Sequence, residues 1–227
     1  MYHYVRIVAN PGKDPLGYGL SVNPDYFEQQ IKYLNDQGYQ SITPDDLYQA
    51  MLGKLALPEK PVLLTFDDGY EDFYTTAFPI LKKYNFKATN FVITGYISES
   101  DNRYLTWDQI KELDQSGLVT IASHTVRHKN VATGSEAWPE IHDSKIVLEK
   151  FLSHPVTAFA YPGGSFNQTA IKLVQQAGYE LAFTTHFGIW HNLGDRLTTT
   201  RVRAGNNLTM DQFIERLSGK FTQVHKK

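Results

Sequence analysis

Residues Pro61-Val62-Leu63-Leu64-Thr65-Phe66-Asp67-Asp68-Gly69 place a continuous apolar run directly before two adjacent carboxylates and a glycine. An apolar run without alternation is typical of a strand buried on both faces, as in parallel sheets. Similar short runs at residues 88–93, 118–122 and 156–161 alternate with segments of helical periodicity. The pattern predicts an α/β fold with roughly seven or eight strands, whose parallel sheet is either closed into a barrel or open and doubly wound.

Several helix boundaries are also indicated. Asn23-Pro24 is typical of a helix start, and Thr106 and Gln109 have the spacing of a capping box. Pro79 lies within a helical pattern over residues 72–84, so it must kink that helix or mark a late start.

Composition narrows the functional classes. The chain has 227 residues, a formal charge of −2, no cysteine and no long polar linker. It carries no basic stripe that would indicate nucleic acid as a partner, and no apolar run approaches the ~20 residues of a membrane span. Because cysteine is absent, a transition-metal site must use His, Asp and Glu.

Three predicted strands end in polar residues. The first ends at Asp67-Asp68-Gly69, the second at His124 with His128 four residues later, and the third at Tyr161-Pro162-Gly163-Gly164. Alone, the first is typical of a turn, and the histidine pair is typical of a solvated helix face. Because parallel strands place their carboxyl ends at one edge, these groups should share a face of the protein.

Together the polar groups indicate a catalytic metal site. His124 and His128 would supply two imidazoles on one side of a helical turn, and a carboxylate from another strand end would complete the ligand set. Two histidines and one carboxylate hold a divalent metal and leave positions open. The adjacent second carboxylate would remain free to act as a base, provided that the chain turns at Gly69.

The residues Thr65-Phe66-Asp67-Asp68-Gly69, followed by Ser123-His124-Thr125-Val126-Arg127-His128, resemble the polysaccharide deacetylase (NodB-homology, carbohydrate esterase family 4) motifs. The resemblance extends from His3 to the region of Arg201 and is strongest to the poly-β-1,6-N-acetylglucosamine deacetylase branch. It implies a distorted (β/α)7 barrel and a single catalytic domain over residues 1–227.

The resemblance also implies roles for the motif residues. Asp67 matches the general base, and Asp68, His124 and His128 match the ligands of one divalent metal. Zinc is the expected metal, with Co²⁺ or Ni²⁺ as alternatives.

Further residues are carried over with departures from the family pattern. Gly163 matches the position whose backbone N–H helps to form the oxyanion hole. Ala160 stands where many members have an arginine that orients the base. We expect an arginine of Thr200-Arg201-Val202-Arg203 to replace it, with Arg201 preferred over Arg203. The catalytic histidine, usually near the C-terminus, is matched here by His3 in Tyr2-His3-Tyr4-Val5, which would be the general acid.

Three aromatic residues are candidates for substrate binding. Tyr161 is placed like a cleft wall, Trp107 like a helix-start residue near the site, and Trp190 could wall the acetyl pocket or fill core. Aromatic rings at such a cleft would suit stacking on sugar faces.

The implied function is hydrolytic removal of acetyl groups from N-acetylglucosamine residues of a polysaccharide. A metal-activated water would attack, Asp67 would take its proton, and protonated His3 would release the amine. The implied location is extracellular or at a bacterial cell surface, with the export signal absent from this sequence and the cytoplasm as the alternative. The oligomeric state is left open.

Other functions remain open at this point. The same site could remove O-acetyl groups from xylan, or act on peptidoglycan or chitin. A glycan-binding barrel without turnover belongs to a different class. Non-haem iron oxygenases use the same ligand types but need no second carboxylate beside the ligand.

Overall fold

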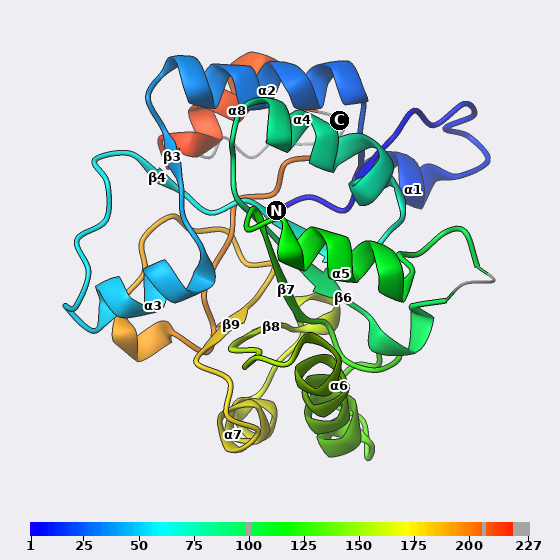
Figure 1. Cartoon of the computed structure of the whole chain (residues 1–227), viewed down its shortest axis with the longest axis vertical. Coiled ribbons are helices and arrows are strands. Elements are labelled where there is room, and N and C mark those ends of the chain that lie inside the picture. Colours follow the sequence, from blue (N-terminus) through cyan, green and yellow to red (C-terminus); the bar gives the residue numbers. More distant parts are fainter. Residues whose placement is uncertain (99–100, 206–207, 220–227) are drawn as a thin grey trace, which may run out of the picture.

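The computed structural model describes residues 1–98, 101–205 and 208–219. Its centre is a curled sheet of five parallel strands whose spatial order follows their order in the sequence (Figure 1). The strands are β5 (Thr65–Asp68), β6 (Ala88–Val92), β7 (Val119–Ser123), β8 (Ala158–Ala160) and β9 (Leu181–Phe183). The predicted α/β class with a parallel sheet is therefore confirmed.

Two extended segments join the edges of this sheet. Beyond β9, Phe183 forms a parallel bridge with Thr199. The Met1 amino group donates to the Val202 carbonyl oxygen at 2.7 Å, and Ala204 N–H donates to the carbonyl of Met1 at 2.9 Å. Tyr2 then forms a parallel bridge with Phe66 of β5. Seven backbone segments thus form the closed sheet: the five strands and the two segments that contain Thr199 and Tyr2. This number is expected for a distorted (β/α)7 barrel, although the last two segments form bridges rather than regular strands.

Two short parallel pairs lie outside the five-stranded sheet. They are β1 (Tyr4–Val5) with β2 (Ser21–Val22), and β3 (Gln40–Ser41) with β4 (Pro61–Val62). The apolar run that the sequence predicted as one strand is therefore divided between β4 and β5. Its first half pairs with β3, while its second half enters the barrel beside β6.

Helices cover the outside of the sheet (Figure 1). They are α1 (Pro15–Leu20), α2 (Pro24–Asp36), α3 (Pro44–Met51), α4 (Phe78–Lys83), α5 (Trp107–Gln115), α6 (Ala137–Leu152), α7 (Gln168–Gln176) and α8 (Met210–Leu217). Short 3₁₀ turns are Thr94–Tyr96, Pro162–Gly164 and Leu193–Asp195. The predicted helix start at Asn23-Pro24 is confirmed, with Asn23 as the N-cap, and so is the predicted capping box of Thr106 and Gln109.

The sequence left open whether Pro79 kinks its helix or marks a late helix start, and the structure of the segment answers this. A π-helical segment over Phe73–Ala77 precedes α4, and Pro79 then lies in the first turn of α4. The proline needs no N–H partner at that position. The backbone is already helical from Asp72 through Ala77, so Pro79 marks the change from π-helical to α-helical geometry and not a late helix start.

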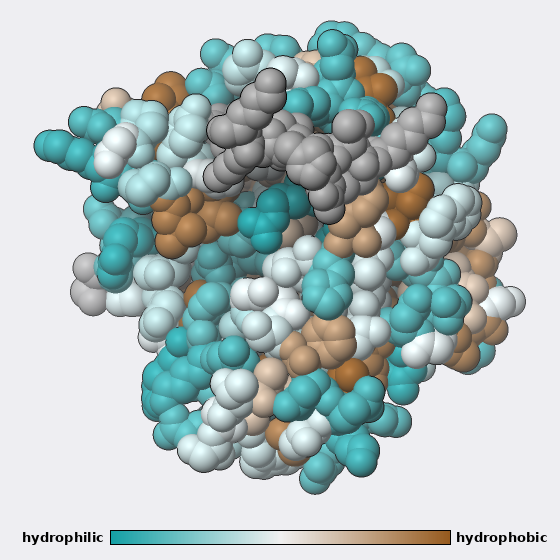
Figure 2. All heavy atoms as spheres, turned by 180° about the vertical axis from the view of Figure 1, so that it is seen from behind, coloured by the Kyte–Doolittle hydropathy of each residue, from teal (hydrophilic) through white to brown (hydrophobic). Residues whose placement is uncertain are grey.

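Apolar residues pack on both faces of the sheet. A small cluster includes the strand residues Phe91, Ala122, Ala160 and Phe183, while the larger one lies between the strands and the helices. Seen from behind, polar residues predominate and apolar residues form small separate groups (Figure 2). Within the described ranges, no helix is both long enough and apolar enough to cross a bilayer.

Asp72 ties the N-terminal strand to the barrel. Its Oδ2 accepts a hydrogen bond from Val5 N–H at 3.1 Å, whereas its buried Oδ1 has no hydrogen-bond partner in the described part of the chain. Burial raises the pKa of Asp72 to about 7. The folded chain therefore keeps this proton to a higher pH than the unfolded chain does.

We expect the free energy of unfolding to fall between about pH 4 and pH 7 because Asp72 must ionise in a buried position. Asp72→Asn keeps an acceptor for Val5 N–H and should remove this loss. The variant should match the wild type near pH 4 and be more stable by up to about 4 kcal/mol above pH 7, since one pKa unit corresponds to about 1.4 kcal/mol. Urea unfolding across this pH range measures the effect, and parallel curves for the two proteins would contradict it.

Candidate metal-dependent active site

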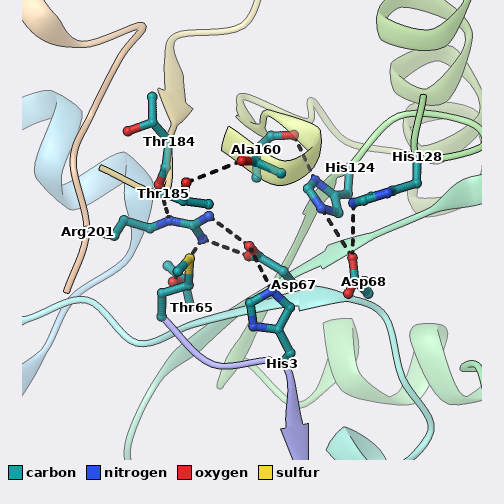
Figure 3. A network of polar contacts seen from close by, with 12 residues as sticks. His3, Thr65, Asp67, Asp68, His124, His128, Ala160, Thr184, Thr185 and Arg201 are labelled. Atoms are coloured by element: carbon teal, nitrogen blue, oxygen red, sulfur yellow. Dashed lines mark hydrogen bonds and ion pairs between the residues drawn. The ribbon is translucent and has the colours of Figure 1, made fainter. Parts of the chain in front are cut away.

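The polar strand ends meet at the carboxyl edge of the sheet. Asp67 and Asp68 end β5, His124 directly follows β7, and Ala160 ends β8 (Figure 3). Parallel pairing of these strands places their carboxyl ends together, as the sequence led us to expect.

Asp68, His124 and His128 form a candidate metal site. The Asp68 Oδ1 lies 3.3 Å from His124 Nε2 and 3.6 Å from His128 Nε2, and one ligand atom from each of the three lies within 4.8 Å of the others. Around a tetrahedral metal with bonds of about 2.0–2.1 Å, neighbouring ligand atoms lie about 3.3–3.5 Å apart. The observed spacing therefore fits a cation of zinc size.

Two further observations show that these residues fit a metal. The Asp68 Oδ1 is buried and has no hydrogen-bond partner within the described residues, so a cation would satisfy it. The His124 Nδ1 lies 2.8 Å from the Ala160 carbonyl oxygen, which can only accept a hydrogen bond. This contact places the ring proton on Nδ1 and leaves the Nε2 lone pair directed toward Asp68.

The backbone that presents the ligands is unusual. Asp68, Thr125 and His128 have φ values of 78°, 70° and 56°, in the left-handed region that non-glycine residues rarely adopt. The two histidines therefore do not share a helical turn, and that expectation was wrong. They converge because the chain turns sharply after β7, with Thr125 Oγ1 accepting a hydrogen bond from His128 N–H at 2.9 Å.

Asp67 lies beside this group and is held by Arg201. The guanidinium Nη1 and Nη2 donate to Oδ1 and Oδ2 of Asp67, each at 2.7 Å, and both side chains are buried. Burial alone would raise the pKa of Asp67, but the Arg201 charge and its two hydrogen bonds outweigh it and hold the pKa well below its usual range. Asp67 is therefore an ionised carboxylate with a fixed orientation.

Arg201 is itself held in place by the barrel. Its Nε donates to the Thr184 carbonyl oxygen at 2.8 Å, and its Nη1 donates to the Thr65 hydroxyl at 3.2 Å (Figure 3). Arg203, the other arginine of this segment, is exposed. The structure thus places Arg201 on the carboxylate that the sequence assigned to it. The carbonyls of Thr184 and Ala160 were not predicted, because a backbone oxygen leaves no residue-type signal.

His3 enters the site from the N-terminal segment. Hydrogen bonds from Tyr2 N–H to the Thr65 carbonyl and from Asp67 N–H to the Tyr2 carbonyl align this segment with β5. The His3 Nε2 lies 4.0 Å from Asp67 Oδ2, and the side chain is mostly buried. Burial lowers the pKa of His3, although the charges of Asp67 and Asp68 oppose this effect.

Two of the remaining predicted site residues, Gly163 and Trp190, are exposed. Gly163 lies in the turn after β8 with φ 62° and is exposed, and a Cβ added there would meet no atom within 4 Å. Trp190 is 87% exposed and lines a cavity of about 550 Å³ that also reaches Arg201 and Thr65.

The predictions for Tyr161 and Trp107 are not supported by their contacts. Tyr161 is fully buried and donates its hydroxyl to the Leu197 carbonyl at 3.0 Å, so it is a core residue and not a cleft wall. Trp107 begins α5 and packs its ring against Phe151 of α6, with centroids 4.5 Å apart. A position at a strand end or helix start does not give the direction of the side chain, so the sequence alone does not show whether such a ring faces a cleft or the core.

The polysaccharide deacetylase family model matches residues 54–182, which include the paired carboxylates and both histidines. The chain belongs to the polysaccharide deacetylase family. Among its relatives, the poly-β-1,6-N-acetyl-D-glucosamine N-deacetylase of Staphylococcus aureus is 32% identical over 178 residues, covering 72% of this chain and 61% of the relative.

Solved structures share the whole fold. The Streptococcus pyogenes deacetylase PplD, solved in complex with acetate, is 34% identical, with a TM-score of 0.86 and coverage of 96% of both chains. IcaB from Ammonifex degensii is 26% identical, with a TM-score of 0.77 and coverage of 96% of this chain and 93% of that one. The chain spans only 36% of the length of the Escherichia coli poly-β-1,6-N-acetyl-D-glucosamine N-deacetylase.

Metal binding at Asp68, His124 and His128 should stabilise the fold. Adding Zn²⁺ to protein treated with a chelator should raise the melting temperature, and a free metal concentration 100 times the Kd corresponds to about 2.7 kcal/mol. His128→Ala should abolish the rise, because it removes one of three ligands. His142→Ala is the control, since that imidazole lies on α6 beside Asp143. An equal rise in His128→Ala would argue against this site.

Proposed function

We propose that the chain is a metal-dependent N-deacetylase that removes acetyl groups from N-acetylglucosamine residues of a polysaccharide. The observation that carries the proposal is the position of Asp67, which is fixed by Arg201 and lies next to both His3 and the Asp68, His124 and His128 group. The N-deacetylase names of several relatives support the choice of an N-acetyl substrate.

Asp67 is the general base in this proposal. Its two-point contact with Arg201 keeps it ionised and prevents it from rotating onto the metal ligands. Asp68, His124 and His128 would hold a divalent metal, whose chemistry would be to polarise the acetyl carbonyl and lower the pKa of the attacking water. The water proton then needs only to move to the adjacent carboxylate.

His3 is the general acid. An amine is a poor leaving group unless it is protonated, so the C–N bond breaks as the His3 imidazolium donates its proton to the sugar nitrogen. The contact between His3 Nε2 and Asp67 Oδ2 keeps the imidazole at the site. The products are acetate and a free amino sugar.

The backbone N–H of Gly163 would stabilise the oxyanion. Its exposed turn after β8 would present a backbone N–H toward the acetyl oxygen as the tetrahedral centre forms. A glycine suits this place because φ is 62° and because the substrate must approach the backbone closely.

Asp67→Asn should bind Zn²⁺ with nearly the wild-type stoichiometry and lose deacetylation by about 10²–10⁴-fold, because the amide cannot accept the water proton. Metal content and acetate release from N-acetylglucosamine oligomers measure the two effects. Asp108→Asn, at the exposed start of α5, is the control. Wild-type turnover in Asp67→Asn would remove it from the mechanism.

His3→Ala should lower turnover of N-acetyl substrates by about 10²–10⁴-fold and that of O-acetyl esters by less, because an alcohol leaving group depends less on protonation. Paired rates on N- and O-acetyl model compounds test this, with His154→Ala on the surface as the control. Equal losses on the two substrates would contradict the role of His3 as the acid.

The substrate itself is tested by an acetate-release screen of the metal-loaded protein. The panel should contain poly-β-1,6-N-acetylglucosamine, chitin oligomers, peptidoglycan and acetylated xylan. Release from the first polymer is the expected result. Preferential release from xylan would favour O-acetyl esterase activity, and metal binding without acetate release would favour a glycan-binding barrel.

A further inference from the structure

Both histidines of the candidate metal site lie on one tight loop, residues 124–128, which we call the ligand loop. Thr125 and His128 adopt left-handed backbone conformations in it. Such conformations persist only where the surrounding structure holds them. The loop therefore depends on contacts from outside itself to keep the two imidazoles convergent.

The first set of contacts comes from the turn after β6. Thr94 N–H donates to the Thr125 carbonyl at 3.1 Å, and Gly95 N–H donates to the Val126 carbonyl at 2.8 Å. A Cβ on Gly95 would lie 2.5 Å from the Val126 carbonyl oxygen, closer than real contacts allow. Gly95 is thus required for this approach, although its φ is not in the left-handed region.

The second contact comes from α6. The Glu140 Oε2 accepts a hydrogen bond from Arg127 N–H at 2.7 Å, and the side chain is only 3% exposed. A buried carboxylate is costly unless it is well bonded, and here it is directed at the backbone between the two histidines.

We propose that Gly95 and Glu140 are positioning residues for the metal site and clamp the ligand loop from two sides. Neither residue would touch the metal. Each would act through the backbone of Val126 or Arg127, so that His124 and His128 reach the metal without reorganisation of the loop. This inference rests on the metal-binding part of the proposed function and is independent of the reaction catalysed.

The test measures Zn²⁺ affinity by competition with a chromophoric chelator, together with thermal unfolding of the metal-free protein. Glu140→Ala should weaken Zn²⁺ binding by about 10–100-fold, the range typical of residues that orient metal ligands. Glu140→Gln keeps an acceptor oxygen and should restore most of the affinity. Asp143→Ala is the control, because Asp143 is an exposed carboxylate on the same helix that pairs with His142.

Gly95→Ala tests the other side of the clamp and keeps the proposal testable if Glu140→Ala does not fold. It should also weaken Zn²⁺ binding by about 10-fold or more. Gly19→Ala is its control, because a Cβ at Gly19 meets no atom within 4 Å. Wild-type affinity in either folded clamp variant would overturn the role of that residue.

A purely structural role would lower the melting temperature of the metal-free protein without a matching loss of affinity, and that result would also overturn the proposal. Failure of the wild type to bind Zn²⁺ would refute the metal site itself. Failure to release acetate, with the affinity pattern as expected, would refute only the proposed reaction.

Discussion

The two-point contact between Arg201 and Asp67 is the interaction on which the site depends. It joins residues 134 positions apart and lies inside the barrel, near the rings of Phe91 and Phe183. Neither charge would be stable there alone, since an unpaired buried charge costs several kcal/mol. Arg201 comes from a segment that is itself part of the barrel wall. The packing that closes the barrel therefore also orients the Asp67 carboxylate.

Closure also explains why His3 can belong to the site. The N-terminal residues lie between the segment around Val202 and strand β5, and the backbone hydrogen bonds of Tyr2 place the next side chain beside Asp67. A polar residue at the start of the chain is thereby brought to the same edge as residues from β5, β7 and β8. The strained conformations of Asp68, Thr125 and His128 occur at this edge, where the surrounding hydrogen bonds can hold them.

Much of the fold could be predicted from local pattern. The apolar runs of β6, β7 and β8 and the caps of α2 and α5 each follow from a few neighbouring residues. The division of residues 61–68 into β4 and β5 could not be predicted, because it depends on which distant strand each half meets.

By itself, the sequence identified the residues of the candidate metal site and the carboxylate beside them. Paired carboxylates at a strand end and two nearby histidines strongly restrict the kinds of site that can form. Few other arrangements of those residue types bind a metal and leave a base free. Only the tertiary structure decided that Arg201 faces Asp67, that Tyr161 points into the core, and that the histidines meet through a left-handed turn. The physical reason is that side-chain direction and long-range pairing depend on packing over the whole barrel, which no local stretch of residues encodes.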